Sequence, residues 1–513
     1  MTSPGLANKR QAAWINYPFF WLLLPVFFVF HGFVENESFI HFRDCLPLIG
    51  EYLGAALVLY LLSWLPVKNK VKAALLSSWV LSFYLFFGAF HDFLRKQAFF
   101  LHRYSLLLPL FALLTVLLIL VLRKRNTFTR LTLFLNSLLL LYLLVDAGSL
   151  LLHTGRGASG KERSVSGNSD YSQPPGTYRD CDTCANPDIY FMIFDEYCAS
   201  NVLKEVYHHD NGELDSLLVK EGFQIQRHSR SNYSITPFSM ASILNLSYLK
   251  NIRDPLHIKA DDYTNIFEPI RTSEVVHFLF SRGYTIVNNS PFDLPGHPAS
   301  IDQPFIPTKT KLITNRTLWN YMVRDIGPWF GERFTSPVLW QESLVSKTYR
   351  LNQQFLAQTI DESGKRSSKP RFVYTHVLMP HIPFAFDSLL HRVEPERSTR
   401  QLSDAEQIPH YLGYLPYTNS RIRELITTIK KNSGGKAVII FMSDHGLRLS
   451  LKDPPDTRLF FANQNAIYFP DRDYRLFYDS MSAVNEFRAV FNKLFRQQIP
   501  FLPDSTILLW DQK

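Results

Sequence analysis

The chain has 513 residues, of which 46% are hydrophobic and 19% are charged, and its formal net charge is +9 at pH 7. This length allows two or three domains. The charge is concentrated: residues 1–160 hold 14 Lys and Arg against 6 Asp and Glu, so +8 of the +9 lies there. A basic excess confined to segments between apolar runs indicates cytoplasmic loops of a membrane protein and argues against nucleic-acid binding.

Apolar runs in the first 152 residues predict an N-terminal membrane domain. Each is close to the ~20 residues that a helix needs to cross ~30 Å of hydrocarbon. The first run begins too late, and is too long and aromatic, for a cleaved signal peptide. We therefore expect a multi-pass α-helical domain at residues 1–152 with about five spans: Trp14–Phe33, Leu46–Leu65, Ala73–Phe93, Ser105–Leu122 and Leu131–Leu152.

Basic clusters in alternate loops set the expected orientation, because Lys and Arg are retained in the cytoplasm. With an odd number of spans, a cytoplasmic N-terminus places everything after Leu152 outside the cytoplasm. A group of basic residues on the other side weakens this pattern: Arg95, Lys96 and Arg103. The clusters that support it are Lys9 and Arg10, then Lys68, Lys70 and Lys72, then Arg123, Lys124, Arg125 and Arg130.

Residues 153–187 are rich in Gly, Ser and Pro and are expected to form a linker. Residues 188–513 alternate short β-rich apolar runs with helical patterns, which predicts an α/β domain with a mostly parallel central sheet. The predicted strands are Asp188–Phe194, Tyr284–Asn288, Arg371–Leu378, Lys436–Met442 and Ala466–Phe469. The predicted helices are Asn201–Glu221, Pro237–Leu244, Ser273–Ser281, Ser343–Ile360, Tyr411–Lys431 and Ala483–Phe495.

Carboxylates and imidazoles follow three of these strands. Ligands of parallel sheets bind outside the carboxyl ends of strands, and mixed oxygen and nitrogen donors suit Zn²⁺ or Mn²⁺. An Asp after one strand is more typical of a turn or helix cap, but three such strand ends in one domain favour a metal site. The residues are Asp195 and Glu196, His376 and His381, and Asp444 and His445.

Thr236 is a candidate nucleophile. Pro237 is favoured at the first position of a helix, which places Thr236 at the N-cap. The hydroxyl there either serves only as a cap, or faces the free N–H groups and positive helix end that can hold a phosphoryl group. Both interpretations can hold together.

These motifs together resemble the alkaline phosphatase superfamily. They are Asp195 after an apolar strand, Thr236 opening a helix, a His-x-Pro segment at His381, and Ser443-Asp444-His445-Gly446 after a late strand. The spans followed by a soluble domain are similar to the membrane-anchored sulfatase-like branch, which includes lipoteichoic acid synthases and phosphoethanolamine transferases. The resemblance implies a bacterial cytoplasmic (inner) membrane protein with a periplasmic or extracellular sulfatase-like α/β domain.

The resemblance also implies roles for particular residues. Asp195, Asp444 and His445 would bind the metal, and Thr236 would be both nucleophile and ligand. The membrane branch usually has Glu in place of Asp195, so Glu196 is a weaker additional ligand. The expected cofactor is one divalent ion, either Zn or Mn. The alternatives that remain open are a second ion, and Mg or Ca in place of Zn or Mn.

Further residues are assigned to proton transfer and to the substrate. His381 would contact the metal or the transferred group, and His376 is a weaker candidate for the same work. Arg448 would clamp a substrate phosphate, unless it is an ordinary surface arginine. Asn232, which opens the stretch before Thr236, is a second candidate substrate contact.

The expected reaction is transfer of a phospho-headgroup, of phosphoethanolamine or phosphoglycerol type, from a membrane phospholipid to an envelope glycan or lipid. The group would pass through a phospho-Thr236 intermediate. Phosphoester, phosphodiester or sulfate-ester hydrolysis is the alternative, and an inactive membrane scaffold is another. The chain has no Cys/Ser-x-Pro/Ala-x-Arg motif, which sulfatases use.

Cys181 and Cys184 lie in the linker, on the side of the membrane where a disulfide is permitted. The spacing leaves open whether they bond. The oligomeric state is not indicated by the sequence.

Overall fold

The computed structural model divides the chain into two compact units, Met1–Ser164 with Pro307–Arg333, and Val165–Ile306 with Phe334–Lys513. Each is described by itself. The structure describes residues 17–37, 40–97, 103–125, 127–156, 178–181, 183–250, 252, 254–258, 260–299, 310–325, 337–393, 402–452 and 454–510.

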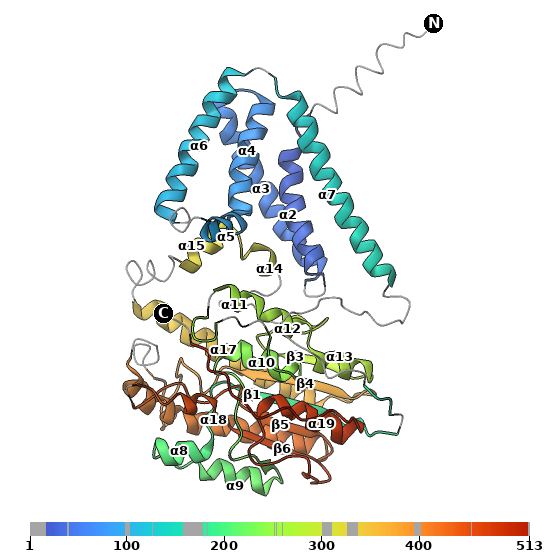
Figure 1. Ribbon diagram of the computed structural model, residues 1–513, viewed down its shortest axis with the longest axis vertical. Helices are drawn as coiled ribbons and strands as arrows, with labels where there is room; N and C mark the ends of the chain where they lie inside the picture. Colours follow the sequence, from blue (N-terminus) through green and yellow to red (C-terminus); the bar gives the residue numbers. More distant parts are fainter. Residues whose placement is uncertain are drawn as a thin grey trace. The chain divides into compact units, whose positions relative to one another are not determined.

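The first unit is helical (Figure 1). Three described helices are long and apolar enough to cross a membrane, and a fourth span results if α4 and α5 are counted as one. α4 and α5 are bent by 65° relative to each other, so the predicted span Ala73–Phe93 is not one straight helix. The helices are α2 (Phe20–Glu35), α3 (Phe42–Val67), α4 (Lys70–Leu85), α5 (Phe87–Gln97), α6 (Tyr104–Lys124) and α7 (Thr129–Arg156).

The described residues therefore contain three to four candidate spans, where the sequence predicted about five. α2 has 16 residues, and at 1.5 Å per residue it is about 24 Å long, short of the ~30 Å hydrocarbon core. Trp14, where the first predicted span begins, lies outside the described residues. The sequence pattern located the apolar segments correctly, but hydropathy alone does not report where a helix breaks.

A segment from the second half of the chain belongs to this first unit. It contains two short helices, α14 (Lys311–Thr314) and α15 (Leu318–Asp325). Ile313 is buried in the same cluster as Phe20 and Trp21 of α2, which explains why the segment packs there. The predicted division at 1–152, 153–187 and 188–513 does not include this insertion.

The second unit is built on a six-stranded sheet of order β2-β6-β5-β1-β4-β3. β1 pairs parallel with β4 and β5, and β3 pairs parallel with β4. β6 is antiparallel to β5 and β2, so the sheet is mixed but mostly parallel, as predicted. The strands are β1 (Ile189–Phe194), β2 (Gln224–Ile225), β3 (Thr285–Asn289), β4 (Arg371–Val377), β5 (Val438–Met442) and β6 (Asn465–Tyr468).

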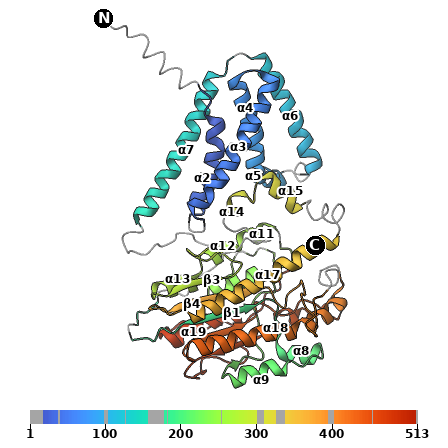
Figure 2. The ribbon, with the colours of Figure 1, turned by 180° about the vertical axis from the view of Figure 1, so that it is seen from behind.

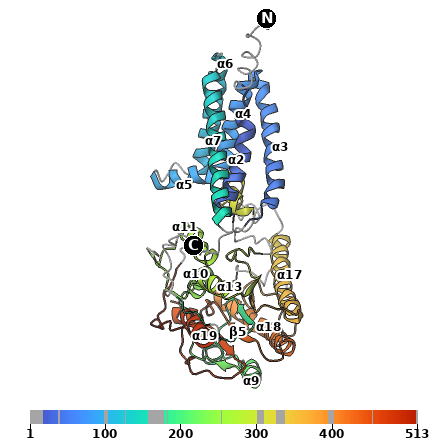
Figure 3. The same ribbon diagram turned by 90° about the vertical axis from the view of Figure 1, so that its right-hand side faces the viewer.

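Helices cover both faces of this sheet (Figures 2 and 3). Side chains of β1 alternate between the faces: Ile189, Phe191 and Ile193 join one buried cluster, and Tyr190, Met192 and Phe194 join the other. The first cluster includes α10 (Thr236–Leu244), α12 (Phe267–Arg271), α13 (Glu274–Ser281) and α19 (Glu486–Phe495). The second includes α8 (Ser200–Val206), α9 (Gly212–Lys220), α17 (Pro337–Gly364) and α18 (Asp404–Asn432). The remaining elements are α11 (Ala260–Asn265), η2 (Thr457–Phe461) and η3 (Ala483–Asn485).

Three local details differ from the prediction or complete it. The predicted helix Asn201–Glu221 is two helices, because the chain turns between α8 and α9, where His208 has a φ of 54°. The two-residue strand β2 was not predicted, since so short a run carries no periodicity. Cys181 and Cys184 form a disulfide.

A buried acid lies on the α19 side of the sheet. The Glu486 carboxyl is fully buried. Its Oε2 accepts hydrogen bonds from Asn465 Nδ2 at 3.0 Å and Gln226 Nε2 at 3.4 Å. Burial raises the pKa of Glu486 from 4.5 to about 7, which the two hydrogen bonds only partly offset.

This pKa predicts a pH dependence of stability. Because the pKa of Glu486 is higher in the folded state than in the unfolded state, its contribution to stability is complete below about pH 4.5, where both states are protonated. The contribution is lost as the pH rises to about 7, because over this range the unfolded state ionises while the folded state still holds the proton. The loss is on the order of 3 kcal/mol. We expect Glu486→Gln to flatten the dependence of the unfolding midpoint on pH across this window, and surface Glu205→Gln to leave it unchanged. Equal slopes in wild type and Glu486→Gln would contradict the assignment.

Candidate metal centre and active site

Parallel pairing brings three strand ends to one edge of the sheet. In β1, Phe194 lies opposite Val377 of β4, and Ile193 lies opposite Met442 of β5. The Asp195 N–H continues this register by donating to Val377 O at 3.0 Å. Residues that follow β1 and β5 therefore emerge side by side.

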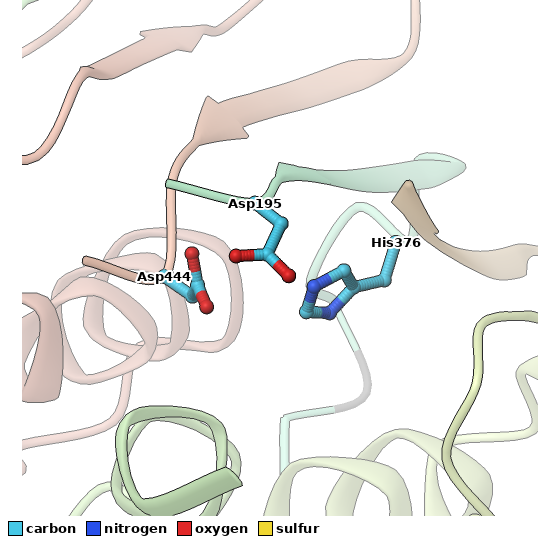
Figure 4. Close-up of side chains that lie close together, drawn as sticks. All are labelled: Asp195, His376 and Asp444. Carbon is cyan, nitrogen blue, oxygen red and sulfur yellow. The ribbon is translucent and has the colours of Figure 1, made fainter. Parts of the chain in front are cut away.

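Asp195, His376 and Asp444 form a buried group at this edge. One donor atom from each residue lies within 4.8 Å of the others. Figure 4 shows the two carboxylates and the imidazole turned toward one another. His376 was predicted as a weaker candidate for proton transfer, but it is the sixth residue of β4 and lies with the two acids. This donor set fits a divalent cation.

Asp444 has one oxygen free for such an ion. Its Oδ1 accepts hydrogen bonds from the N–H groups of Glu196, at 3.0 Å, and His445, at 2.9 Å. Its Oδ2 is buried and has no hydrogen-bond partner among the described residues. Burial opposes ionisation, but the polar groups around the carboxylate, among them the Glu196 N–H, hold the pKa of Asp444 below its usual value. The carboxylate is therefore charged and available.

His376 is held in a form that can bind a metal. Burial lowers its pKa to about 4, so the ring is neutral. Its Nδ1 lies 2.9 Å from Tyr374 Oη, while Nε2 is buried without a hydrogen-bond partner among the described residues. When Nδ1 carries the proton and donates to Tyr374, Nε2 presents a lone pair to the two acids.

Tyr374 was missed in the sequence. It lies two residues before His376, and residues with this spacing face the same side of a strand. The alternation of side chains along β4 could have indicated that Tyr374 lies beside His376. Using that pattern requires knowing that His376 acts from within the strand.

Thr236 and His445 adjoin the acidic group. Thr236 Oγ1 lies 3.2 Å from His445 Nε2, and His445 Nε2 lies 3.4 Å from Asp444 Oδ2 and 3.8 Å from Asp195 Oδ1. His445 Nδ1 lies 2.9 Å from Gly446 O, to which it donates, so Nε2 faces Thr236 with a lone pair. The structure thus brings together Asp195, Thr236, Asp444 and His445, which the sequence analysis had proposed as one site. Their roles stay predictions.

Thr236 is the first residue of α10, and Ile235 occupies the N-cap position. The predicted N-cap is therefore shifted by one residue. The reason is that the extended backbone of Ile235 already accepts the first helical hydrogen bonds, from Phe238 N and Ser239 N. Ser239 Oγ donates to Asp444 O at 2.5 Å. This bond joins the start of α10 to the loop after β5.

Glu196 belongs to a second cluster, with Arg448 and His381. Its φ of 61° is in the left-handed region, which is rare for residues other than glycine. Its Oε1 accepts from Arg448 N at 3.0 Å and lies 3.4 Å from Arg448 Nε, and its Oε2 lies 3.6 Å from His381 Nε2. The carboxylate is therefore engaged by Arg448 and faces the His381 ring, and it is not part of the buried group of Asp195, His376 and Asp444.

The neighbours of Glu196 in this second cluster favour its ionised form. Burial alone would raise the pKa of Glu196, but His381 and Arg448 outweigh it and hold that pKa below its usual value. The Arg448 side chain keeps 30% exposure. His381 and Arg448 thus both contact Glu196, and the roles predicted for them stay predictions.

Asn232, predicted as a substrate contact, has a structural role. It is 1% exposed. Its Oδ1 accepts from Val484 N at 2.7 Å, and its Nδ2 donates to Tyr248 Oη and Ser505 O, both at 2.9 Å. These bonds use both amide protons, so the described contacts give no support to the predicted substrate role, which stays a prediction. The side chain joins the segment before α10 to the C-terminal segment.

The sequence was also compared with known proteins. Residues 300–485 match the Sulfatase family model, and no curated protein matched. Similar solved structures include the C-terminal periplasmic domain of EptC from Escherichia coli, with 12% identity, 67% of this chain and 91% of that chain covered, and a TM-score of 0.40.

Two further structures illustrate the range of similar proteins. Lipooligosaccharide phosphoethanolamine transferase A from Neisseria meningitidis has 13% identity, 94% and 95% coverage and a TM-score of 0.38. The phosphonate monoester hydrolase of Agrobacterium radiobacter has 12% identity, 60% and 74% coverage and a TM-score of 0.36. With TM-scores below 0.5 these similarities are weak, and the family match carries the comparison.

The donor set predicts stabilisation by a divalent ion. Adding Zn²⁺ or Mn²⁺ to metal-free full-length protein should raise the unfolding midpoint. At a free metal concentration a hundred times Kd, the free energy of unfolding should increase by about 3 kcal/mol. Asp444→Asn keeps the shape but removes the charge, and it should abolish this rise. Surface Asp361→Asn should retain it. A metal-induced rise in Asp444→Asn equal to that of the wild type would exclude this site.

Gly446 allows a close approach of two backbone segments. A Cβ at this position would lie 2.3 Å from Leu459 O and 2.8 Å from Ala462 N. Since backbone atoms cannot move aside cheaply, Gly446→Ala should destabilise the protein by about 1–3 kcal/mol and weaken metal binding by displacing the adjacent Asp444 and His445. Gly364→Ala, whose nearest atom is 3.8 Å away, is the matched control. Calorimetric unfolding of both variants checks this, and equal midpoints would refute the constraint.

Proposed function

We propose that this chain, whose residues 300–485 match the Sulfatase family model and whose described helices include candidate membrane spans, is a metal-dependent phosphotransferase of the alkaline phosphatase superfamily that acts on a membrane phospholipid. One observation carries the proposal. The Thr236 hydroxyl lies 3.2 Å from His445 Nε2, and His445 borders the buried group of Asp195, His376 and Asp444.

Asp195, His376 and Asp444 would hold one divalent ion, Zn²⁺ or Mn²⁺, with Thr236 as a further donor. His445, expected from the resemblance to be a ligand, would instead act as the base, because the single lone pair on its Nε2 cannot both bind the ion and accept a proton. Such an ion lowers the pKa of a hydroxyl and offsets the charge of a phosphoryl group. The free Oδ2 of Asp444 and Nε2 of His376 support this assignment. Mg²⁺, Ca²⁺ and a second ion remain alternatives.

In the first step, Thr236 Oγ forms a bond to phosphorus and the bond from phosphorus to the diacylglycerol oxygen breaks. The hydroxyl proton passes to His445 Nε2. His381 protonates the departing oxygen: its Nδ1–H donates to Ile382 O, and its Nε2 faces the ionised Glu196. The carboxylate stabilises the protonated ring, which then acts as general acid.

In the second step, an acceptor hydroxyl attacks the phospho-threonine. Its proton passes to His381, which became neutral in the first step, and the Thr236 oxygen takes back the proton held by His445. Both histidines return to their starting states. Arg448, beside Glu196, would hold a phosphoryl oxygen.

The membrane helices support a lipid donor, because they raise the local concentration of headgroups around the protein. We propose a bacterial cytoplasmic (inner) membrane location with the catalytic domain on the outer side, based on the basic loops between the spans. The acceptor would then be an envelope glycan or lipid, and the transferred group is of phosphoethanolamine or phosphoglycerol type.

Hydrolysis is the second candidate, and the Sulfatase family match favours it. Water would replace the acceptor hydroxyl in the second step. Sulfate esters fit less well than phosphoesters, because the sequence has no Cys/Ser-x-Pro/Ala-x-Arg motif. An inactive scaffold fits least, since the site keeps a nucleophile, acids and imidazoles in contact.

The proposal predicts a covalent adduct. Metal-replete protein incubated with mixed phospholipids should release diacylglycerol and carry one headgroup phosphate on the Thr236 peptide by mass spectrometry. Thr236→Ala should lower diacylglycerol release at least about a thousandfold, while Thr427→Ala, on the exposed side of α18, should not.

The products separate the alternatives. Headgroup phosphate attached to an added glycan or lipid indicates transfer, and free headgroup phosphate indicates hydrolysis. Neither adduct nor diacylglycerol with any lipid, in metal-replete protein, would refute both the lipid substrate and the transferase.

A further inference from the structure

The insertion in the first unit fits closely onto the membrane helices. Gly88 N, in α5, donates to Arg316 O at 2.7 Å. Tyr321 Oη, in α15, donates to Asp92 Oδ2 at 2.8 Å, and the Tyr321 ring packs edge-on against Phe87 at 5.7 Å. Figures 1 and 2 show α15 beside α5. The segment is therefore held by backbone, polar and aromatic contacts at once.

Two glycines make room for it. A Cβ on Gly32 of α2 would lie 2.8 Å from Ile313 Cγ2. A Cβ on Gly88 would lie 2.7 Å from Arg316 O and 2.8 Å from the Tyr321 ring. Larger side chains at either position would push the insertion away, so the membrane helices are shaped to receive it.

The insertion also carries an exposed apolar side. Trp319 and Val323 of α15 are 62% and 47% exposed, and their spacing of four residues places them on one helix side. Tyr321, on the packed side, is 4% exposed. On the neighbouring α5, Phe90 and Phe93 are 45% and 59% exposed.

A lipid surface is the partner that fits these side chains. Trp is enriched at the boundary between headgroups and hydrocarbon, and short amphipathic helices lie in that boundary with their apolar side inward. The exposed Arg316 precedes α15 and suits contact with headgroup phosphates. The same unit exposes Leu110 and Leu113 on α6, as expected of a helix that faces lipid.

We propose that residues 310–325 are a membrane anchor of the catalytic chain, which inserts Trp319 and Val323 into the lipid boundary beside α5. The anchor enters the chain between strands β3 and β4 of the catalytic sheet. This proposal does not depend on the chemistry of the active site. It adds to the proposed function a way of keeping the catalytic domain at a membrane that contains the lipid substrate.

Chain length gives this anchor a mechanical consequence. Ala299 belongs to the second unit and Thr310 to the first, so eleven peptide steps connect them, which reach at most about 40 Å when extended. The connection from Arg156 to Tyr178 has twice as many steps and reaches about 79 Å. The insertion therefore sets the tighter limit on how far the two units can separate.

Spin labels test the anchor in full-length protein in nanodiscs of phosphatidylethanolamine and phosphatidylglycerol. Cys45 and Cys198 are buried and the other two cysteines are bonded, so an introduced cysteine takes the label. Labels at Trp319→Cys and Val323→Cys should be relaxed by oxygen, which concentrates in lipid, and protected from a water-soluble nickel chelate. A label at Leu389→Cys, which is 72% exposed in the second unit, should show the reverse.

Other results would overturn the proposal. Nickel access at 319 equal to that at 389 would mean exposure to water, protection from both agents would mean cover by protein, and dipolar broadening would mean a second copy. As a second variant, Gly88→Leu should displace the insertion and raise nickel access at 323 but not at a label on Leu113→Cys. No change at 323 would refute the docking. Because no turnover is measured, an inactive enzyme does not affect the outcome.

Discussion

The site depends on the burial of two like charges at one edge of a sheet. Asp195 and Asp444 are 3% and 0% exposed, and like charges in a poorly solvated place are tolerated only with opposite charge or hydrogen-bond donors beside them. The N–H groups of Glu196 and His445 supply part of this compensation to Asp444. A divalent ion would complete it and would use the Asp444 oxygen that the described residues leave without a partner.

Strand pairing makes this arrangement unavoidable. β1 lies between β4 and β5 and is parallel to both, so the acids after β1 and β5 must leave the sheet at the same edge. His376 reaches that edge from within β4, and Ser239 fastens the start of α10 to the same loop as Asp444. The proposed nucleophile and the proposed ligands therefore come from four elements distant in sequence, fixed by one sheet.

Much of this was predictable, for physical reasons. Apolar strands with acids after them are local patterns, so Asp195 and Asp444 could be recognised and their meeting inferred from parallel topology. Thr236 was located by the preference of Pro237 for a helix start. The direction of a side chain was not predictable. Glu196, whose backbone adopts a positive φ, contacts Arg448 and His381. Asn232 forms a hydrogen bond with a residue some 250 positions away.

The membrane part shows the same limit. Hydropathy found the apolar segments, but it counts apolar residues and does not see the break between α4 and α5 or the short length of α2. Residues 310–325 were missed because their partners, Gly32 and Gly88, are distant in sequence and have no side chains to form a pattern. Contacts that rely on the absence of side chains are invisible to periodicity.

The central claim is that Asp195, His376 and Asp444 share one divalent ion next to Thr236. X-ray absorption at the metal edge of full-length protein loaded with one equivalent of Zn²⁺ tests it most directly. The account predicts oxygen and nitrogen donors only, with imidazole scattering that decreases in His376→Ala and oxygen donors that change in Asp444→Asn. Sulfur ligation, or a spectrum that neither substitution alters, would contradict it.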